Sequence, residues 1–205
     1  MARPQAKDHD SKRETILLTA AEVFASSGIV GASMNGVAQS CGISKANIYH
    51  YYNSKNDLVF DILNNYLGKL RDRICSLDLS GQSAPEQLHA LTKEFLLAYE
   101  GMDNEHKIQT EGVSLLSELQ QTVLKNYQKE LVAIVYEAVR NCAPDTFGQQ
   151  SMKCRQVTMS IFGMLNWFYM WHPKATQEQR IDYAATIAEL TLHGIKGSST
   201  QLGNT

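Results

Sequence analysis

Apolar side chains recur at the spacing of an amphipathic helix through the first part of the chain. The pattern runs from about Lys12 to Ser27, and Gly28 is placed to end it. Ser11, with Glu14 three residues later, forms the sequence signature of a capping box, so this helix is expected to begin directly after Ser11.

Two very short helical patterns follow, separated by a tight turn at Gly42. Ser33 and Ser44 are the candidate N-caps of these two helices. In the second of them, Ile48 and Tyr52 lie four residues apart and are expected to face the first helix. Most of the remaining side chains of this helix are polar and are expected to point outward, which is typical of a helix that enters a DNA groove.

A long apolar pattern begins after Ser54, which forms another capping signature with Asp57, and continues to about Leu77. Such a helix is roughly 34 Å long, which suits a lever between two domains. After a loop at 78–85, the pattern predicts further helices at about 85–101, 104–116, 118–142, 150–171 and 177–196. The chain is therefore expected to be all-α, with about nine helices.

These elements predict a small head at residues 11–56 and a larger helical domain at residues 57–196. Residues 1–10 are expected to be a disordered arm and residues 197–205 a flexible tail. The chain has no apolar run of the roughly 20 residues that span a bilayer and no secretory signal, so a cytoplasmic location is expected.

Charge distribution favours nucleic acid as a partner of the head only modestly. The chain of 205 residues has a net charge of −2, which divides into +2 for residues 1–56 and −4 for the rest. The positive part is the one with the two short helices, which is the sign that a DNA-binding domain requires.

Motifs for catalysis or metal binding are missing from the sequence. The four cysteines are far apart and have no CxxC spacing, and no HExxH motif is present. The glycines at 28, 31 and 36 follow no predicted strand, so they do not form a phosphate-binding loop. We expect no enzyme activity, no metal and no cofactor.

Residues 33–52 have the organisation of a helix-turn-helix: a short helix, a tight turn and a second helix whose early residues are exposed and polar. Lysine bonds guanine acceptors and asparagine pairs with adenine in the major groove, whereas hydroxyl groups suit phosphates. The expected DNA contacts are Lys45 and Asn47 for base edges; Tyr49 and His50 for bases or sugars; Ser33, Tyr51 and Lys55 for phosphates; and Ser44 and Ala46 at the start of the same helix.

The stretch GISKANIYHYYNSKNDLV resembles the recognition helix and hinge of the TetR family of transcriptional regulators. The preceding ILLTAAEVFASSGIVGASMNGVAQSCG resembles the first two helices of the same family, so the similarity covers about residues 12–60. The resemblance implies a homodimeric repressor that binds a palindromic operator. It also implies that an effector in the C-terminal domain tilts the long fourth helix and changes the spacing of the two heads.

The last two predicted helices resemble the dimerisation pair of that family, and the first of them is apolar on nearly every side, as a helix buried against two partners would be. The residues expected at the dimer interface are Phe162, Trp167, Ala184, Ala188 and Leu192. The stretch Leu165–Pro173 also resembles a branch of the family that responds to acyl-CoA thioesters.

A small hydrophobic or amphipathic effector is expected to bind the C-terminal domain, although each apolar candidate is also suited to the core. The candidate contacts are Phe95, Tyr99, Met102, Glu111, Leu115, Tyr127, Leu131, Asn166 and Tyr169. Two other functions fit the pattern: an all-α ligand carrier or enzyme with a structural head, and a DNA-binding module without an effector.

Overall fold

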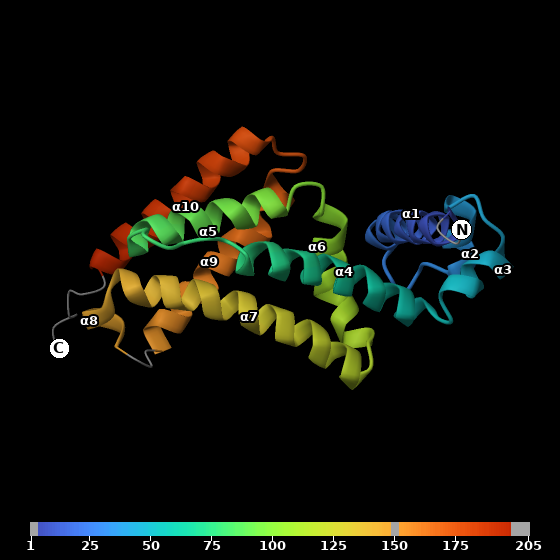
Figure 1. Cartoon of the computed structure of the whole chain (residues 1–205), viewed down its shortest axis with the longest axis horizontal. Helices are drawn as coiled ribbons and strands as arrows, with labels where there is room; N and C mark the ends of the chain where they lie inside the picture. The colour runs from blue at the N-terminus through green and yellow to red at the C-terminus, as the bar shows by residue number, and fades with distance from the viewer. Residues whose placement is uncertain (1–3, 149–151, 198–205) are drawn as a thin grey trace. The chain divides into compact units, whose positions relative to one another are not determined.

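The structure is a computed structural model that describes residues 4–148 and 152–197. These residues form ten α-helices and one short 3₁₀ helix and contain no strand, which confirms the predicted all-α class (Figure 1). The elements are α1 (Pro4–Ser27), α2 (Met34–Ser40), α3 (Lys45–Tyr51), α4 (Lys55–Cys75), α5 (Ala84–Ala98), α6 (Asp103–Gly112), η1 (Val113–Leu115), α7 (Glu118–Cys142), α8 (Pro144–Phe147), α9 (Met152–Trp171) and α10 (Gln177–Gly197).

The first helix differs most from its prediction. It begins at Pro4 rather than at Lys12, so the predicted disorder of residues 1–10 is wrong from residue 4 onward. Ser11 lies inside the helix, where its carbonyl accepts a hydrogen bond from Thr15 Oγ at 3.0 Å, and it does not cap the helix. Residues 1–3 and 198–205, at the ends of the predicted arm and tail, lie outside the described residues.

The chain divides into two compact units. The first contains residues 1–68 and 102–126, and the second contains residues 69–101 and 127–205. The first unit is larger than the predicted head at residues 11–56, because α6, η1 and the start of α7 belong to it. Two of the three boundaries fall within helices, since α4 and α7 each contribute to both units, and the third falls between α5 and α6.

In the first unit, α1 packs against α2 and α6, and α2 packs against α3. Gly112, the last residue of α6, shows how closely these elements approach one another. A Cβ atom on Gly112 would lie 3.1 Å from both Ile29 Cδ1 and Val59 Cγ1. Lys107 of α6 also donates a hydrogen bond to the carbonyl of Ala25, one of the carbonyls left free at the C-terminal end of α1.

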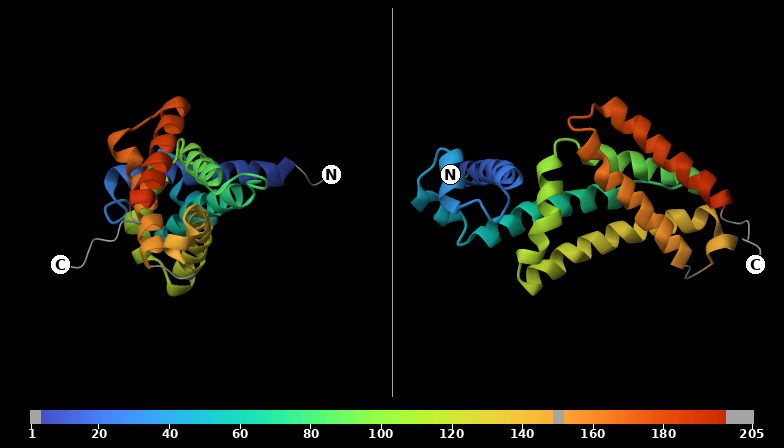
Figure 2. Two further views of the ribbon diagram at one scale, coloured as in Figure 1. Left: turned by 90° about the vertical axis from the view of Figure 1, so that its left-hand side faces the viewer. Right: turned by 180° about the vertical axis from the view of Figure 1, so that it is seen from behind.

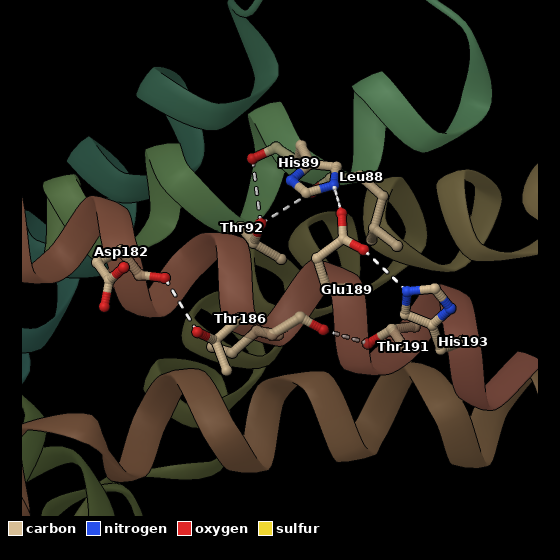
Figure 3. Close-up of polar contacts among 9 residues, drawn as sticks. Leu88, His89, Thr92, Asp182, Thr186, Glu189, Thr191 and His193 are labelled. Atoms are coloured by element: carbon tan, nitrogen blue, oxygen red, sulfur yellow. Dashed lines mark hydrogen bonds and ion pairs between the residues drawn. The ribbon is translucent and has the colours of Figure 1, made fainter.

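In the second unit, α5 and α10 run side by side (Figure 2). The carboxylate of Glu189 on α10 lies 2.9 Å from Nε2 of His89 on α5 and 3.2 Å from Nε2 of His193 (Figure 3). Exposed contacts of this kind contribute at most about 1 kcal/mol, so the pairing of the helices depends mainly on their buried residues. The hydroxyls of the buried Thr92 and Thr191 donate to carbonyls of their own helices. Each hydroxyl therefore has a hydrogen-bond partner without one from the opposite helix.

Arg180, on α10, is the most buried charged residue described in this unit, with only 2% of its surface exposed. Its guanidinium donates to the carbonyl of Ala175 at 3.3 Å and to the carbonyl of Leu96 at 3.2 Å. Leu96 lies in the last turn of α5, where carbonyls lack helical partners and a positive charge is favourable. Arg180 therefore caps α5 and holds it against the start of α10.

Candidate nucleic-acid interface

Local sequence signals define the two short helices of the head. The hydroxyl of Ser33 accepts from the backbone N–H of Gly36 at 3.0 Å, and that of Ser44 accepts from Asn47 at 3.1 Å, so both predicted N-caps are present. Between the helices, Gly42 adopts φ +66°. The N–H groups of Gly42 and Ile43 return to carbonyls of α2, which is the Schellman pattern of a helix that ends in a glycine.

The third helix has one buried face and one exposed face. Ile48 is fully buried and Tyr52 is 6% exposed, which confirms the prediction that these two residues anchor the helix. Tyr51 is half-buried. Every other residue of α3 is exposed, and these residues are Lys45, Ala46, Asn47, Tyr49 and His50. These five residues are all predicted DNA contacts, so each of them lies on a surface that is open to a ligand.

A hydrogen-bonded cluster on α4 holds the end of α3. Asp61 accepts from the Tyr52 hydroxyl at 2.6 Å and from Nη2 of Arg13 at 2.5 Å, so one carboxylate joins α1, α3 and α4. Burial of the Tyr52 ring, together with the adjacent Asp61 carboxylate, raises the pKa of Tyr52 well above its ordinary value. The tyrosine therefore remains a neutral hydrogen-bond donor at physiological pH.

The ammonium of Lys55 bonds backbone carbonyls, although the sequence predicted that it contacts a phosphate. Its ammonium donates to the carbonyls of Ile29, Val30 and Ala32, at 2.6, 3.2 and 2.9 Å. An ammonium group has three N–H donors, and here all three have a backbone partner. Lys55 thus holds the turn that leads from α1 to the N-cap Ser33, which leaves no N–H group of its ammonium for the expected phosphate contact.

The sequence predicted neither the hydrogen bonds of Lys55 to backbone carbonyls nor the cluster of Arg13, Asp61 and Tyr52. The partners of Lys55 are backbone carbonyls more than 20 residues away, and backbone groups leave no sequence signal. Asp61 left a weak signal, because it is an acidic residue directly beside the buried Leu58 and Ile62 positions of α4. A charged group at the edge of an apolar stripe commonly has a buried partner.

The predicted effector contacts fall in both units. In the second unit, the hydroxyl of the buried Tyr99 donates to Asn166 Oδ1 at 2.8 Å, and Phe95 packs edge-on against Tyr99 and Phe162. Burial raises the pKa of Tyr99 above its ordinary value. Also in this unit, Leu131 is buried, Tyr169 is half-buried, and Tyr127 is half-buried beneath the guanidinium of Arg71.

The other three predicted effector contacts belong to the first unit. Met102 is the half-buried N-cap of α6, whereas Glu111 and Leu115 are exposed. The structure therefore brings together Phe95, Tyr99 and Asn166 as one cluster of the second unit.

The predicted dimer interface requires correction. Phe162, Ala184 and Ala188 are at most 8% exposed within the single chain, because Phe162 packs on Phe95 and α10 packs on α5. These three residues are core residues. Trp167 is 61% exposed, and Leu192 is half-buried. The exposed apolar side chains of α9 and α10 are instead Met152, Met159, Trp167, Met170, Trp171, Ile181 and Leu190.

Within residues 4–148 and 152–197, no group of three or more His, Cys, Asp or Glu side chains is arranged to hold a metal ion. All four cysteines are free thiols. No helix in the described part of the chain is long and apolar enough to cross a membrane.

Two family models match the chain. Residues 16–62 match the model of bacterial regulatory proteins of the tetR family, and residues 81–195 match the model of the tetracyclin repressor-like C-terminal domain. The transcriptional repressor KstR2 of Mycolicibacterium smegmatis is 30% identical over 137 residues. That match spans 63% of this chain and 65% of the relative, so just under two thirds of the relative's length is covered.

Solved structures match over a larger share of the chain. A TetR-family transcriptional regulator from Bordetella parapertussis has 28% identity and a TM-score of 0.81, and the match covers 88% of this chain and 93% of that one. AibR, solved in complex with isovaleryl coenzyme A and operator DNA, has 23% identity and a TM-score of 0.71, with 88% and 98% covered. The helix-turn-helix geometry and the two family models lead to one conclusion: the chain belongs to the TetR family of bacterial regulatory proteins.

Proposed function

We propose that the protein is a transcriptional repressor that binds a palindromic operator as a homodimer and is released from it by a small hydrophobic or amphipathic effector. The observation that carries the proposal is the shape of α3. Its seven residues bury Ile48 and leave five side chains exposed, so the helix has little use as core and is suited to a major groove.

Lys45 and Asn47 are proposed to bond base edges, while Tyr49 and His50 contact bases or sugars. Ser33, Ser44 and Tyr51 are the proposed phosphate contacts, and Ala46 lies at the groove wall. Lys55 acts indirectly, because it holds the turn before Ser33. This assignment separates residues that read sequence from residues that set the register of the helix on the duplex.

Replacing Lys45 or Tyr49 by alanine should each weaken operator binding about 100-fold. A direct contact to a base is worth on the order of 1–3 kcal/mol, and a symmetric dimer loses it in both half-sites. The measurement is a titration of the purified protein against the DNA that flanks its own gene, by gel shift or fluorescence anisotropy, at several salt concentrations.

Lys93→Ala is the matched control, because Lys93 is an exposed lysine of α5 in the second unit. This variant should bind the operator as the wild type does. If the wild type shows no salt-dependent, sequence-specific binding to DNA, the proposal fails, and an all-α carrier or enzyme with a structural head becomes the better description.

A dimer is proposed to form through the exposed apolar side chains of α9 and α10. Five of them are each more than half exposed: Met152, Trp167, Met170, Trp171 and Leu190. Exposed aromatic and methionine side chains in one region are typical of an interface core. In such a dimer, the two α3 helices must lie roughly 34–36 Å apart to reach successive turns of the groove.

The effector is proposed to bind the second unit near Phe95, Tyr99 and Asn166, where the hydroxyl of the buried Tyr99 bonds the amide of the exposed Asn166 and the Tyr99 ring packs on Phe95. AibR, whose fold this chain shares, is bound to isovaleryl coenzyme A, and this supports an acyl-CoA as the effector class. Because α4 contributes to both units, a ligand that shifts it would change the spacing of the heads.

An acyl-CoA should raise the thermal midpoint of the protein and release it from the operator, whereas coenzyme A alone should do neither. A ligand that binds only the folded state stabilises it, by about 2.7 kcal/mol at a concentration of 100 times its Kd. Isovaleryl-coenzyme A and a longer acyl-coenzyme A are the probes, with thermal unfolding and operator titration as the readouts.

Tyr99→Phe should weaken the response to the acyl-CoA without changing operator binding of the free protein, because the hydroxyl belongs to the second unit, whereas α3 belongs to the first. If no acyl-CoA changes either the thermal midpoint or the operator affinity, the effector class is wrong, and the DNA-binding result stands by itself.

A further inference from the structure

The ring of Tyr51, at the end of α3, lies between two imidazoles. The ring of His9, on α1, stacks on Tyr51 with a centroid distance of 4.8 Å and an interplanar angle of 27°. The ring of His50 meets Tyr51 edge-on, at 5.7 Å and 86°. His9 lies 42 positions before Tyr51 in the chain and belongs to the early part of α1, which was expected to be disordered.

Burial does not explain why the start of α1 lies against α3. Among the described side chains of α1 before Ile16, none is buried, and His9 itself is exposed. The contacts that join this segment to the rest of the head include the His9–Tyr51 stack and the pairing of Arg13 with Asp61. The stack therefore acts at the edge of the α3 surface, outside the core.

A stacked pair of this kind contributes little to the free energy of folding, but it restricts the orientation of the ring. The Tyr51 ring has one face against His9 and one side against His50, so the direction of its hydroxyl is determined by contacts from α1 as well as from α3. A hydroxyl held in one direction bonds a ligand at a smaller cost in conformational entropy than a mobile one.

We propose that His9 is a positioning residue for DNA binding: it stacks on Tyr51 and holds the tyrosine hydroxyl toward a phosphate of the operator. This inference rests on the proposed function, because it takes Tyr51 as a phosphate contact. It extends the DNA-binding apparatus from α2 and α3 to the first turns of α1.

The experiment compares His9→Ala and His9→Phe with the wild type in operator titrations over a range of salt concentrations. His9→Ala should weaken binding about fivefold, since the stack is lost in both half-sites. His9→Phe should restore wild-type affinity, because phenylalanine keeps a flat ring against Tyr51. The slope of log K against log salt should be the same for all three proteins, because the phosphate contact is a neutral hydrogen bond from Tyr51.

A double-mutant cycle shows whether His9 acts through the tyrosine hydroxyl. Tyr51→Phe keeps the ring and removes the hydroxyl, so adding His9→Ala to Tyr51→Phe should cause no further loss of affinity. Thr15→Ala is the matched control on the same exposed segment of α1 and should bind as the wild type does. Circular dichroism and thermal unfolding should show all of these variants folded.

Two results would overturn the inference. In the first, His9→Ala binds the operator as tightly as the wild type. In the second, His9→Phe does not restore affinity and the salt slope falls by about 0.9 for each His9 lost, which means that His9 itself contacts a phosphate as a cation. Both results leave the proposed function intact as long as the wild type binds the operator and Lys45→Ala binds it more weakly. Failure of the wild type to bind would instead refute the proposed function.

Discussion

Trp167→Glu is expected to convert the proposed dimer to a monomer and to abolish operator binding at concentrations where the wild type is saturated. Trp167 is 61% exposed on α9, so the charge does not enter the core of the single chain. At the centre of an interface, loss of a tryptophan costs about 2 kcal/mol or more per copy, and the dimer contains two copies. The Kd of the dimer should therefore rise about a thousandfold. Sedimentation velocity measures the mass of the protein in solution and checks this result.

The matched control is Leu119→Glu. Leu119 is an apolar side chain on α7 that is 77% exposed, and it lies outside the proposed interface. The same change of charge there should leave the mass and the operator affinity unchanged. A Trp167→Glu protein that remains dimeric and binds the operator normally would place the interface on another surface.

Asp61→Ala is expected to lower the thermal midpoint by about 5 °C and to weaken operator binding. The substitution leaves the hydroxyl of Tyr52, which is 6% exposed, without its acceptor. A buried donor without a partner costs about 2 kcal/mol, and for a protein of this size that corresponds to several degrees. The lost pairing with Arg13 adds little, because the Arg13 side chain is 43% exposed.

Asp72→Ala supplies the comparison for Asp61→Ala, because Asp72 also lies on α4 and pairs with an arginine, Arg71, but is 72% exposed. It should change the midpoint by less than about 1 °C. In a Tyr52→Phe background, Asp61→Ala should cost much less, since the buried hydroxyl is no longer present. Equal midpoints for Asp61→Ala and Asp72→Ala would show that the cluster does not stabilise the head.

Signals from residues that are close together in the sequence were sufficient to predict most of the helices. The caps at Ser33 and Ser44 and the glycine at 42 act within a few residues, so the pattern predicted where α2 and α3 begin and where α2 ends. The spacing of apolar residues predicted the long helices in the same way, because it too is a pattern among residues that are close together in the chain. It did not predict the start of α1, where the described side chains before Ile16 are not buried and no apolar stripe exists.

The apolar pattern also could not decide which apolar side chains remain exposed. The sequence shows that α9 is apolar on several sides, but Phe162 faces Phe95 and Trp167 faces outward only because of how α5 and α10 pack. For the same reason, Ala184 and Ala188 were assigned to a dimer surface and are core residues.

The sequence by itself therefore determined the helical class, the helix-turn-helix and the exposed side chains of α3, because these depend on contacts between near neighbours in the chain. Only the tertiary structure decided the contacts of Lys55, Asp61 and His9, whose partners lie between 9 and 48 residues away. Such partners are chosen by the packing of whole helices, which hydrophobic spacing alone does not specify.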